Sequence, residues 1–257
     1  MPFAADIFYA IFEGGDTQPP VILIHGAGSS HLCWPVQIRR MPGRRMLVLD
    51  LPGHGRSSGS GEHSIEAYSE RLINFFTELN IHQAVLVGHS MGGAIALNLA
   101  LHYPELVTSL GLISCAAYLG MLNELVEQFK NPQNGAAVVQ MFQQRAFSPF
   151  TGNAVVHQSM ELLKTVRPGV FYGDLKACAD FDLHGQIEKI IAPAWVAVGA
   201  DDLITTPACA HYLGTALPSA RLMVIPHAGH MVLVEQPKAL SQGLTDFLAR
   251  VLRYWTT

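Results

Sequence analysis

The sequence has few charged residues and no excess of basic ones. Of its 257 residues, only 14% are Asp, Glu, Lys or Arg, against about 25% in an average soluble domain. The formal net charge is -4, which argues against the basic face that nucleic-acid binding requires, and we expect no nucleic-acid partner. In a chain of this length, so low a charge favours a large buried core, an apolar pocket, or both.

The sequence also lacks paired cysteines, a signal sequence and a long apolar run. Its four cysteines include no C-x-x-C pair, which indicates reduced thiols rather than a disulfide framework or a metal site; they are Cys33, Cys115, Cys178 and Cys209. No basic segment followed by an apolar stretch opens the chain, and no run approaches the ~20 apolar residues that span a bilayer. We therefore expect a cytoplasmic protein without metal, cofactor or membrane span.

Apolar runs typical of buried strands alternate with longer helical patterns over much of the chain. The predicted strands cover residues 21–24, 46–49, 84–87, 109–113, 195–198 and 222–225. Ser64 is placed to cap an amphipathic helix, and a last helix is expected from about Pro237 to Trp255. This alternation predicts an α/β fold, with a mostly parallel central sheet and helices on both faces.

Between residues 116 and 188 the pattern changes to helical spacing alone, broken at Asn131-Pro132, Ser148-Pro149 and Arg167-Pro168-Gly169. The segment leaves the sheet after the strand at 109–113, at the carboxyl edge where sites form in open α/β sheets. We interpret 116–188 as an all-helical cap, or lid, inserted into a core made of 1–115 and 189–257. Its acidic residues Asp174, Asp180 and Asp182 are interpreted as surface or loop carboxylates.

A serine flanked by small residues joins a predicted strand to a predicted helix. Gly88-His89-Ser90-Met91-Gly92 has the form G-x-S-x-G and lies between the apolar run 84–87 and the helix-forming run 94–101. Such a turn strains the backbone at the serine, and the flanking glycines remove the clashes that would prevent it. The hydroxyl then lies at a helix N-terminus, where free N–H groups favour developing negative charge. We predict Ser90 to be a nucleophile.

A serine nucleophile needs a base to take its proton. Five of the twelve histidines lie near strand ends: His25, His54, His89, His227 and His230. We favour His230 as the base because it lies deep in the last loop, beside a glycine. His227 is expected to point into the structure from the strand end, and His89 to lie on the other side of the elbow. His25 is expected mainly to brace its loop.

The base in turn needs a carboxylate to orient it. In the order Ser, Asp or Glu, His, this carboxylate follows a strand between the serine and the histidine. Gly199-Ala200-Asp201-Asp202 closes such a strand. We favour Asp202, because the loop needs several residues beyond Gly199 to turn toward the site. Asp201 is a candidate for capping the helix that begins near Pro207.

The oxyanion of an acyl-transfer intermediate needs two N–H donors held in advance. The N–H of Met91, directly after the serine, is one predicted donor. The other is assigned to Ala27, in the loop after the strand at 21–24. We expect substrate contacts from this loop and from the cap: His25, Gly26, Leu119, Phe142 and Met231.

Five segments, in this order, resemble the α/β-hydrolase superfamily: His25–Gly28, Asp50–Ser57, Gly88–Gly93, Gly199–Asp202 and His227–His230. The resemblance covers the chain from about residue 20 to its end. It implies the α/β-hydrolase fold with a helical cap, and a Ser90–Asp202–His230 triad. The segment Asp50–Ser57 resembles the family's structural turn. Within the superfamily, the chain looks most like small carboxylesterases such as the pimeloyl-[acyl-carrier-protein] methyl ester esterase group.

These features predict a serine hydrolase that cleaves carboxylic esters of small to medium apolar acyl groups through an acyl-enzyme. Three alternatives stay open on the same residues: a carbon–carbon bond hydrolase, a cofactor-free haloperoxidase or perhydrolase, and a ligand receptor with little turnover. The expected partner is a small-molecule ester. Delivery of that ester by an acyl carrier protein would call for basic residues on the cap, where the candidates are Lys130, Arg145, Lys164, Arg167 and Lys176.

Overall fold

The computed structural model describes residues 2–13, 19–130 and 134–251. Its sheet has the strand order β1-β2-β4-β3-β5-β6-β7-β8. The strands are β1 (Phe3–Ala4), β2 (Ile7–Glu13), β3 (Val21–Ile24), β4 (Arg45–Leu49), β5 (Ala84–His89), β6 (Val107–Ile113), β7 (Ala194–Gly199) and β8 (Ala220–Ile225). β2 runs antiparallel to β1 and β4, and all other neighbours are parallel. The predicted mostly parallel sheet is confirmed, and every predicted strand falls within an observed one.

Successive residues of the central strands point to opposite faces of the sheet, as the pleat requires. In β3, Ile22 and Ile24 join one apolar cluster while Val21 and Leu23 join the other. All four side chains are completely buried. A strand that is apolar at every position is what a parallel sheet covered on both faces needs.

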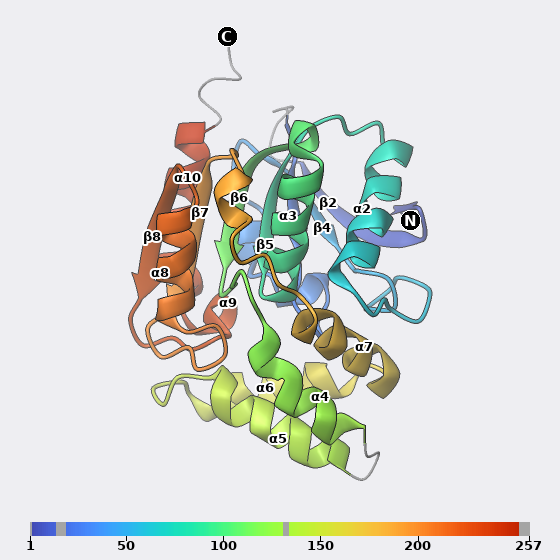
Figure 1. The fold of residues 1–257 in the computed structure, drawn as a ribbon, viewed down its shortest axis with the longest axis vertical. Helices are drawn as coiled ribbons and strands as arrows, with labels where there is room; N and C mark the ends of the chain where they lie inside the picture. The colour runs from blue at the N-terminus through green and yellow to red at the C-terminus, as the bar shows by residue number, and fades with distance from the viewer. Residues whose placement is uncertain (1, 14–18, 131–133, 252–257) are drawn as a thin grey trace.

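Helices cover both faces of the sheet (Figure 1). One apolar cluster includes residues of α2 (Ile65–Glu78), α3 (Met91–His102) and α8 (Pro207–Ala216); the other includes residues of α1 (Val36–Arg39), α9 (Val232–Glu235) and α10 (Pro237–Val251). Short 3-10 helices occur at His31–Cys33, Pro104–Leu106, Gly120–Leu122 and Ile187–Lys189. The predicted cap of α2 is present, since Ser64 Oγ accepts a hydrogen bond from the Ala67 N–H. The predicted last helix is confirmed from Pro237 to Val251. Its predicted end at about Trp255 lies outside the described residues.

Among the described residues, four α-helices lie between β6 and β7: α4 (Asn123–Phe129), α5 (Gly135–Ala146), α6 (Asn153–Lys164) and α7 (Pro168–Ala179). We call residues 116–188 the helical insert. Figure 1 shows these helices stacked beyond one end of the sheet. Two predicted breaks, at Ser148-Pro149 and at Arg167–Gly169, coincide with helix ends; the Asn131-Pro132 break lies outside the described residues. Backbone hydrogen bonds from Leu119 to Phe181 and from Leu183 to Ala117 join the two ends of the insert.

All four cysteines are free thiols, and Cys209 is the only one of them that is not fully buried. None of the described helices combines the length and apolar character needed to cross a membrane.

Candidate active site

Ser90 occupies a sharp turn between β5 and α3. Its backbone has φ 52° and ψ -117°, in a region that costs a non-glycine residue conformational strain. The glycines around it are required for packing: a Cβ on Gly92 would lie 2.2 Å from the Ile24 carbonyl oxygen, and one on Gly88 would lie 2.2 Å from the Gly92 oxygen. The sequence therefore folds into the predicted elbow, because only glycine fits where β5, α3 and β3 meet.

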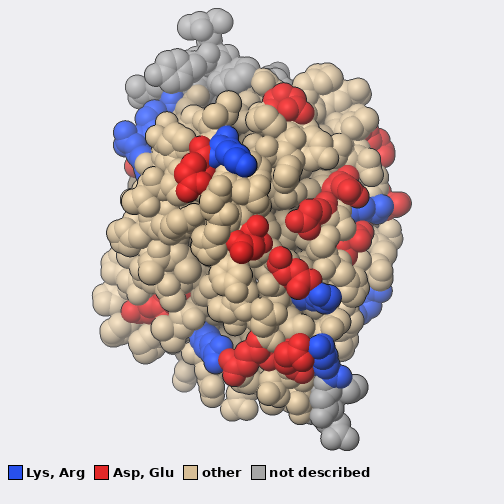
Figure 2. Space-filling view, viewed as in Figure 1, with Lys and Arg blue, Asp and Glu red and all other residues tan. Residues whose placement is uncertain are grey.

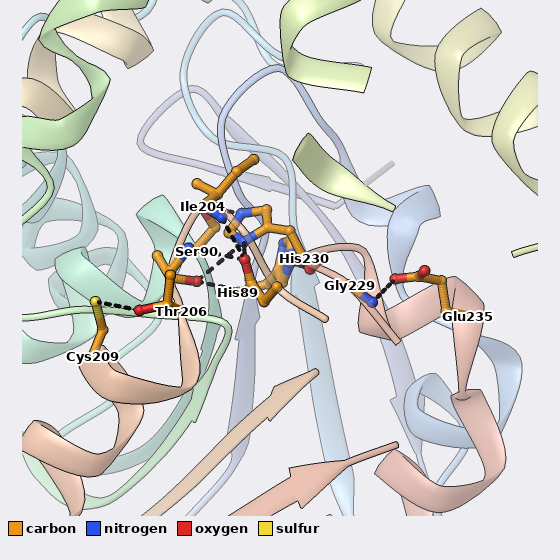
Figure 3. A network of polar contacts seen from close by, with 10 residues as sticks. His89, Ser90, Ile204, Thr206, Cys209, Gly229, His230 and Glu235 are labelled. Carbon is orange, nitrogen blue, oxygen red and sulfur yellow. Dashed lines mark hydrogen bonds and ion pairs between the residues drawn. The ribbon is translucent and has the colours of Figure 1, made fainter. Parts of the chain in front are cut away.

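The structure brings Ser90, His230 and Asp202 together from three separate loops. His230 Nε2 lies 2.9 Å from Ser90 Oγ, and His230 Nδ1 lies 3.0 Å from Asp202 Oδ2. His230 and Asp202 are almost completely buried, while Ser90 is half-buried. Figure 3 shows the Ser90 and His230 side chains facing one another. A carboxylate on Nδ1 leaves Nε2 free to accept the serine proton, which is the geometry of an activated hydroxyl.

Asp202 accepts hydrogen bonds from more than the imidazole. The backbone N–H groups of Ile204 and Thr205 donate to Oδ1, at 2.8 and 2.9 Å. Burial alone would raise the pKa of Asp202, but the charge and hydrogen bond of His230 and these further donors lower it below 3.8. The carboxylate is therefore ionised at neutral pH and can stabilise an imidazolium.

Thr205 is a site residue that the sequence reasoning missed. Its hydroxyl donates to Asp202 Oδ2 at 2.9 Å and lies 3.1 Å from His230 Nδ1. The side chain is completely buried. The sequence offered a signal for part of this arrangement, since an aspartate side chain in a turn commonly accepts the backbone N–H two residues on, as Asp202 does from Ile204. That pattern does not indicate the contact of the Thr205 hydroxyl.

Glu235, at the end of α9, holds the loop that carries His230 in place through hydrogen bonds. Glu235 Oε2 accepts the Gly229 N–H at 2.8 Å, as Figure 3 shows. Its other oxygen accepts the N–H of Ser148, from the helical insert, at 2.8 Å. The Met231 N–H also donates to the Ala146 oxygen of the insert. The insert thus helps to fix the histidine loop.

The other histidines near strand ends have different roles from the base. His25 is buried and braces its loop as predicted: Nδ1 donates to the Gly26 oxygen and Nε2 accepts the Leu51 N–H. Burial lowers the pKa of His25 to about 4, so the ring is neutral. The prediction that His227 points into the structure was wrong, since its side chain is exposed and packs on Phe150.

The prediction for the direction of the His89 side chain was also wrong. Its ring lies beside that of His230, and its Nε2 donates to the His230 carbonyl oxygen at 2.9 Å. Burial, followed by the proximity of His230, lowers the pKa of His89 to about 3. A neutral His89 therefore supports the backbone of the histidine loop.

Ala27 lines the cavity at Ser90 and Met91 directly follows the serine, and their roles as oxyanion donors stay a prediction. Met91 is the first residue of α3, so its N–H has no partner within the helix. Ala27 follows Gly26, and a Cβ on Gly26 would lie 3.1 Å from Ser90 Cβ. The loop can approach the serine this closely only because residue 26 is glycine.

A cavity of about 60 Å³ opens at Ser90. Of the predicted substrate contacts, Gly26, Phe142 and Met231 line it, together with Phe147, Met160 and Leu163. The other two do not reach it: Leu119 is completely buried in the core, and both ring nitrogens of His25 are already hydrogen-bonded. Leu119 comes before the first helix of the insert, where the insert packs on the core. The spacing of apolar residues could not show that this position faces the core and not the cavity.

A second, larger apolar cavity lies within the insert. Its volume is about 670 Å³, and its lining includes Phe129, Val139, Leu163 and Phe171. Leu163 lines both cavities, and the Phe142 and Phe171 rings make an edge contact between them. Leu163, Phe142 and Phe171 of the insert thus separate the cavity at Ser90 from the larger apolar cavity.

The segment Asp50–Ser57 forms the structural turn that the resemblance implies. Asp50 is completely buried and accepts the N–H groups of His31 and Arg56. Burial would raise its pKa, but hydrogen bonds from His31 and Arg56 lower it below 3.8. Gly55 has φ +49°, and a Cβ there would collide with the Asp50 carboxylate.

Two aspartates near the site differ from their predicted roles. Asp174 was interpreted as a surface or loop carboxylate, but it is completely buried; Asp180 and Asp182 are exposed as expected. Asp201 does not cap α8 and instead accepts a hydrogen bond from Ser148 Oγ at 2.6 Å. Both predictions failed for the same reason: the residues that contact Asp174 and Asp201 lie far from these aspartates in the sequence.

The basic residues of the insert all have partners within the molecule. Lys130, Arg145, Lys164 and Lys176 each pair with a carboxylate, and Arg167 donates to the backbone oxygens of Gly53 and Gly59. Figure 2 shows one face of the molecule, where acidic and basic side chains are interspersed without a continuous basic patch.

Over the described residues, no cluster of three or more His, Cys, Asp or Glu could hold a metal ion.

The sequence matches the model of the alpha/beta hydrolase family over residues 21–242. The chain belongs to this family. The hydrolase is 27% identical over 93% of both chains to a putative 2-succinyl-6-hydroxy-2,4-cyclohexadiene-1-carboxylate synthase of Bacillus subtilis. It is also 27% identical to 3-oxoadipate enol-lactonase 2 of Acinetobacter baylyi, over 94% of this chain and 92% of that one.

Among solved structures, the hydrolase resembles a thermophilic esterase, with a TM-score of 0.80 and 27% identity over 95% of this chain and 98% of the other. The predicted α/β-hydrolase fold is thereby confirmed. The finer likeness to pimeloyl-[acyl-carrier-protein] methyl ester esterases stays a prediction.

Proposed function

We propose that this hydrolase is a serine carboxylesterase that works through an acyl-enzyme. The observation that carries the proposal is the continuous chain of contacts from Ser90 Oγ through His230 to Asp202, at 2.9 and 3.0 Å. The esterase and enol-lactonase among its relatives support it, since both names describe cleavage of an ester bond.

In the proposed reaction, Ser90 Oγ attacks the ester carbonyl carbon while His230 Nε2 takes the hydroxyl proton. Asp202 stabilises the resulting imidazolium through Nδ1–H. The N–H groups of Ala27 and Met91 are the proposed donors to the oxyanion of the tetrahedral intermediate. His230 then gives its proton to the leaving alcohol, which departs and leaves the acyl group on Ser90.

Deacylation repeats these steps with water as the nucleophile. His230 takes a proton from the water as it attacks the acyl carbon, and returns the proton to Ser90 Oγ when the carboxylic acid leaves. Every proton in this cycle passes through Nε2 of one imidazole. The molecule needs no other acid or base.

We propose that the acyl group is apolar and small to medium in size. The helical insert lines the cavity at Ser90 with the apolar side chains of Phe142, Phe147, Met160, Leu162 and Leu163, and the small volume of the cavity suits a short group. Burial of each methylene in such a lining contributes about 0.8 kcal/mol. Longer chains would have to pass Leu163 into the larger cavity of the insert.

Turnover of p-nitrophenyl butyrate tests the proposed function. We expect repeated turnover by the native protein, and a loss on the order of 10³-fold or more in Ser90→Ala. Ser219→Ala, an exposed serine after α8, is the matched control and should keep full activity. Near-normal turnover by Ser90→Ala, or a single stoichiometric burst without turnover, would contradict the proposal; the second result is the one expected of a ligand receptor.

A further inference from the structure

Asp174 is a completely buried carboxylate that crosses the boundary between the helical insert and the core. It lies on α7 of the insert, yet its three hydrogen-bond donors belong to the core. Asp174 Oδ2 accepts the Gly28 N–H and His54 Nε2–H, both at 2.8 Å. Its Oδ1 accepts the Tyr68 hydroxyl at 2.6 Å. A buried carboxylate with this many donors is held in one position.

The Gly28 N–H belongs to the peptide group that links Ala27 to Gly28. Fixing that peptide plane limits the rotation of Ala27, whose own N–H is a proposed oxyanion donor. The packing adds to this restraint: Gly28 has φ +62°, and a Cβ there would lie 2.5 Å from Leu163 and 2.8 Å from Phe171. We call His25–Gly28, the loop that carries Ala27, the oxyanion loop. The insert therefore contacts this loop both through Asp174 and through direct packing.

His54 explains how a carboxylate can be buried here. Its Nε2 faces Asp174 and its Nδ1 lies 3.1 Å from the Pro52 carbonyl oxygen. Both partners are acceptors, so both ring nitrogens carry hydrogens and the ring is an imidazolium. Burial opposes that charge, but the charge of Asp174 and its hydrogen bond outweigh burial and raise the pKa of His54 above 6.5. The pair is neutral as a whole, which reduces the cost of burying it.

We propose that Asp174 is a positioning residue for the oxyanion loop, acting on the Ala27–Gly28 peptide from across the insert–core boundary. The active site is then complete only when α7 is seated on the core. This inference rests on the proposed function, because it presumes an oxyanion that Ala27 stabilises. It differs from a purely structural role, in which Asp174 would hold the insert in place without affecting the reaction.

The test compares Asp174→Ala, Asp174→Asn and Tyr68→Phe in the full-length protein. Tyr68→Phe is the matched control, since it removes a buried hydrogen bond from the same carboxylate but leaves the bond to Gly28. We would measure kcat and KM for p-nitrophenyl butyrate, per active site titrated with a p-nitrophenyl phosphonate. The inhibition constant of an alkyl trifluoromethyl ketone, which forms an oxyanion on the serine, gives a second reading. Melting temperatures report stability separately.

We expect Asp174→Ala to lower kcat on the order of 10- to 100-fold, because a displaced oxyanion donor loses its geometry. KM should change less than about threefold, and the ketone inhibition constant should rise by the same factor as kcat falls. Asp174→Asn keeps an acceptor for the Gly28 N–H and should recover kcat to within about tenfold of the native value. Tyr68→Phe should lower the melting temperature but leave kcat within about twofold.

Two results would overturn the proposal. One is a fall in melting temperature in the Asp174 variants with kcat per titrated site and ketone inhibition unchanged. The other is a loss of kcat in Tyr68→Phe as large as that in the Asp174 variants. If Asp174→Ala does not fold, Asp174→Asn and Tyr68→Phe decide. A loss of kcat in Asp174→Asn that is within about tenfold but larger than in Tyr68→Phe, with an equal rise in the ketone inhibition constant, supports the proposal, and equal kcat values in the two variants overturn it. A native protein without turnover would instead overturn the proposed function itself.

Discussion

Thr205 shares its hydroxyl between the two residues that would activate Ser90. It donates to Asp202 and lies within hydrogen-bond distance of His230 Nδ1. A carboxylate held by two backbone N–H groups and one hydroxyl keeps a single orientation, and the imidazole takes its orientation from that carboxylate. The orientation of the His230 imidazole, the proposed base, therefore depends on Thr205, which takes no part in proton transfer.

Replacing Thr205 tests that dependence. Thr205→Val keeps the shape and removes the hydroxyl, and we expect kcat to fall about tenfold with little change in KM, which corresponds to one hydrogen bond. Thr206→Val is the matched control, because the Thr206 hydroxyl contacts Cys209 rather than the site. Steady-state kinetics with p-nitrophenyl butyrate measure both variants. An equal loss in the two would show that the hydroxyl does not position Asp202.

At the scale of elements, the elbow depends on the close approach of β3, β5 and α3. We expect Gly92→Ala to destabilise the protein by several kcal/mol or to prevent folding, because its Cβ would overlap the Ile24 carbonyl oxygen. Gly135→Ala is the control, since nothing lies within 4 Å of a Cβ there and alanine in a helix stabilises by up to about 1 kcal/mol. Urea unfolding measures both. A soluble Gly92→Ala protein of native stability would contradict this account of the turn.

Leu163, on α6, lines both cavities and so forms part of the wall between them. We expect Leu163→Ala to open a path into the larger cavity and to shift the preferred p-nitrophenyl ester from short acyl chains toward longer ones. Leu162→Ala is the control, since Leu162 lines the cavity at Ser90 but not the larger one. A series of esters from acetate to decanoate measures the shift. The same chain-length optimum in both variants would show that the larger cavity does not receive the acyl group.

Local signals account for what the sequence could predict. Ser90, Asp202 and His230 each follow a strand of the parallel sheet within a recognisable loop, so their convergence at one sheet edge could be expected. The contacts of Asp174 with Gly28 and of Glu235 with Ser148 span 146 and 87 residues. No pattern along the chain indicates such pairs. The direction of His89 was missed because its partner, the His230 carbonyl oxygen, lies 141 residues away. The direction of His227 was missed because its positive φ departs from strand geometry.

At the scale of the whole molecule, buried histidines make stability depend on pH. His25 and His89 are neutral in the fold, with pKa values lowered by burial to about 4 and about 3. In the unfolded chain their pKa is near 6.5, so below that pH the unfolded state binds protons that the folded state does not. We expect the free energy of unfolding to fall by roughly several kcal/mol between pH 6.5 and pH 4. A flat profile from urea unfolding over this range would contradict their burial as neutral rings.

His54 has the opposite effect, because its pKa in the fold is raised. The groups around it are Asp174, Asp50 and the ring of His25. Its stabilising charge is fully present below pH 6.5 and is lost as pH rises through its folded pKa. We expect the free energy of unfolding to decline on this alkaline side in the native protein, and to decline less in Asp174→Asn. An equal decline in both proteins would mean that another group titrates there.

The most direct test of the account is covalent labelling of the serine. A p-nitrophenyl alkylphosphonate should add one phosphonyl group per chain, release one p-nitrophenol, and abolish esterase activity in proportion. Peptide mass spectrometry should place the group on Ser90, and His230→Ala should slow the labelling on the order of 10³-fold or more. Labelling at any other residue, or full activity in stoichiometrically labelled protein, would contradict the claim that Ser90 is the nucleophile.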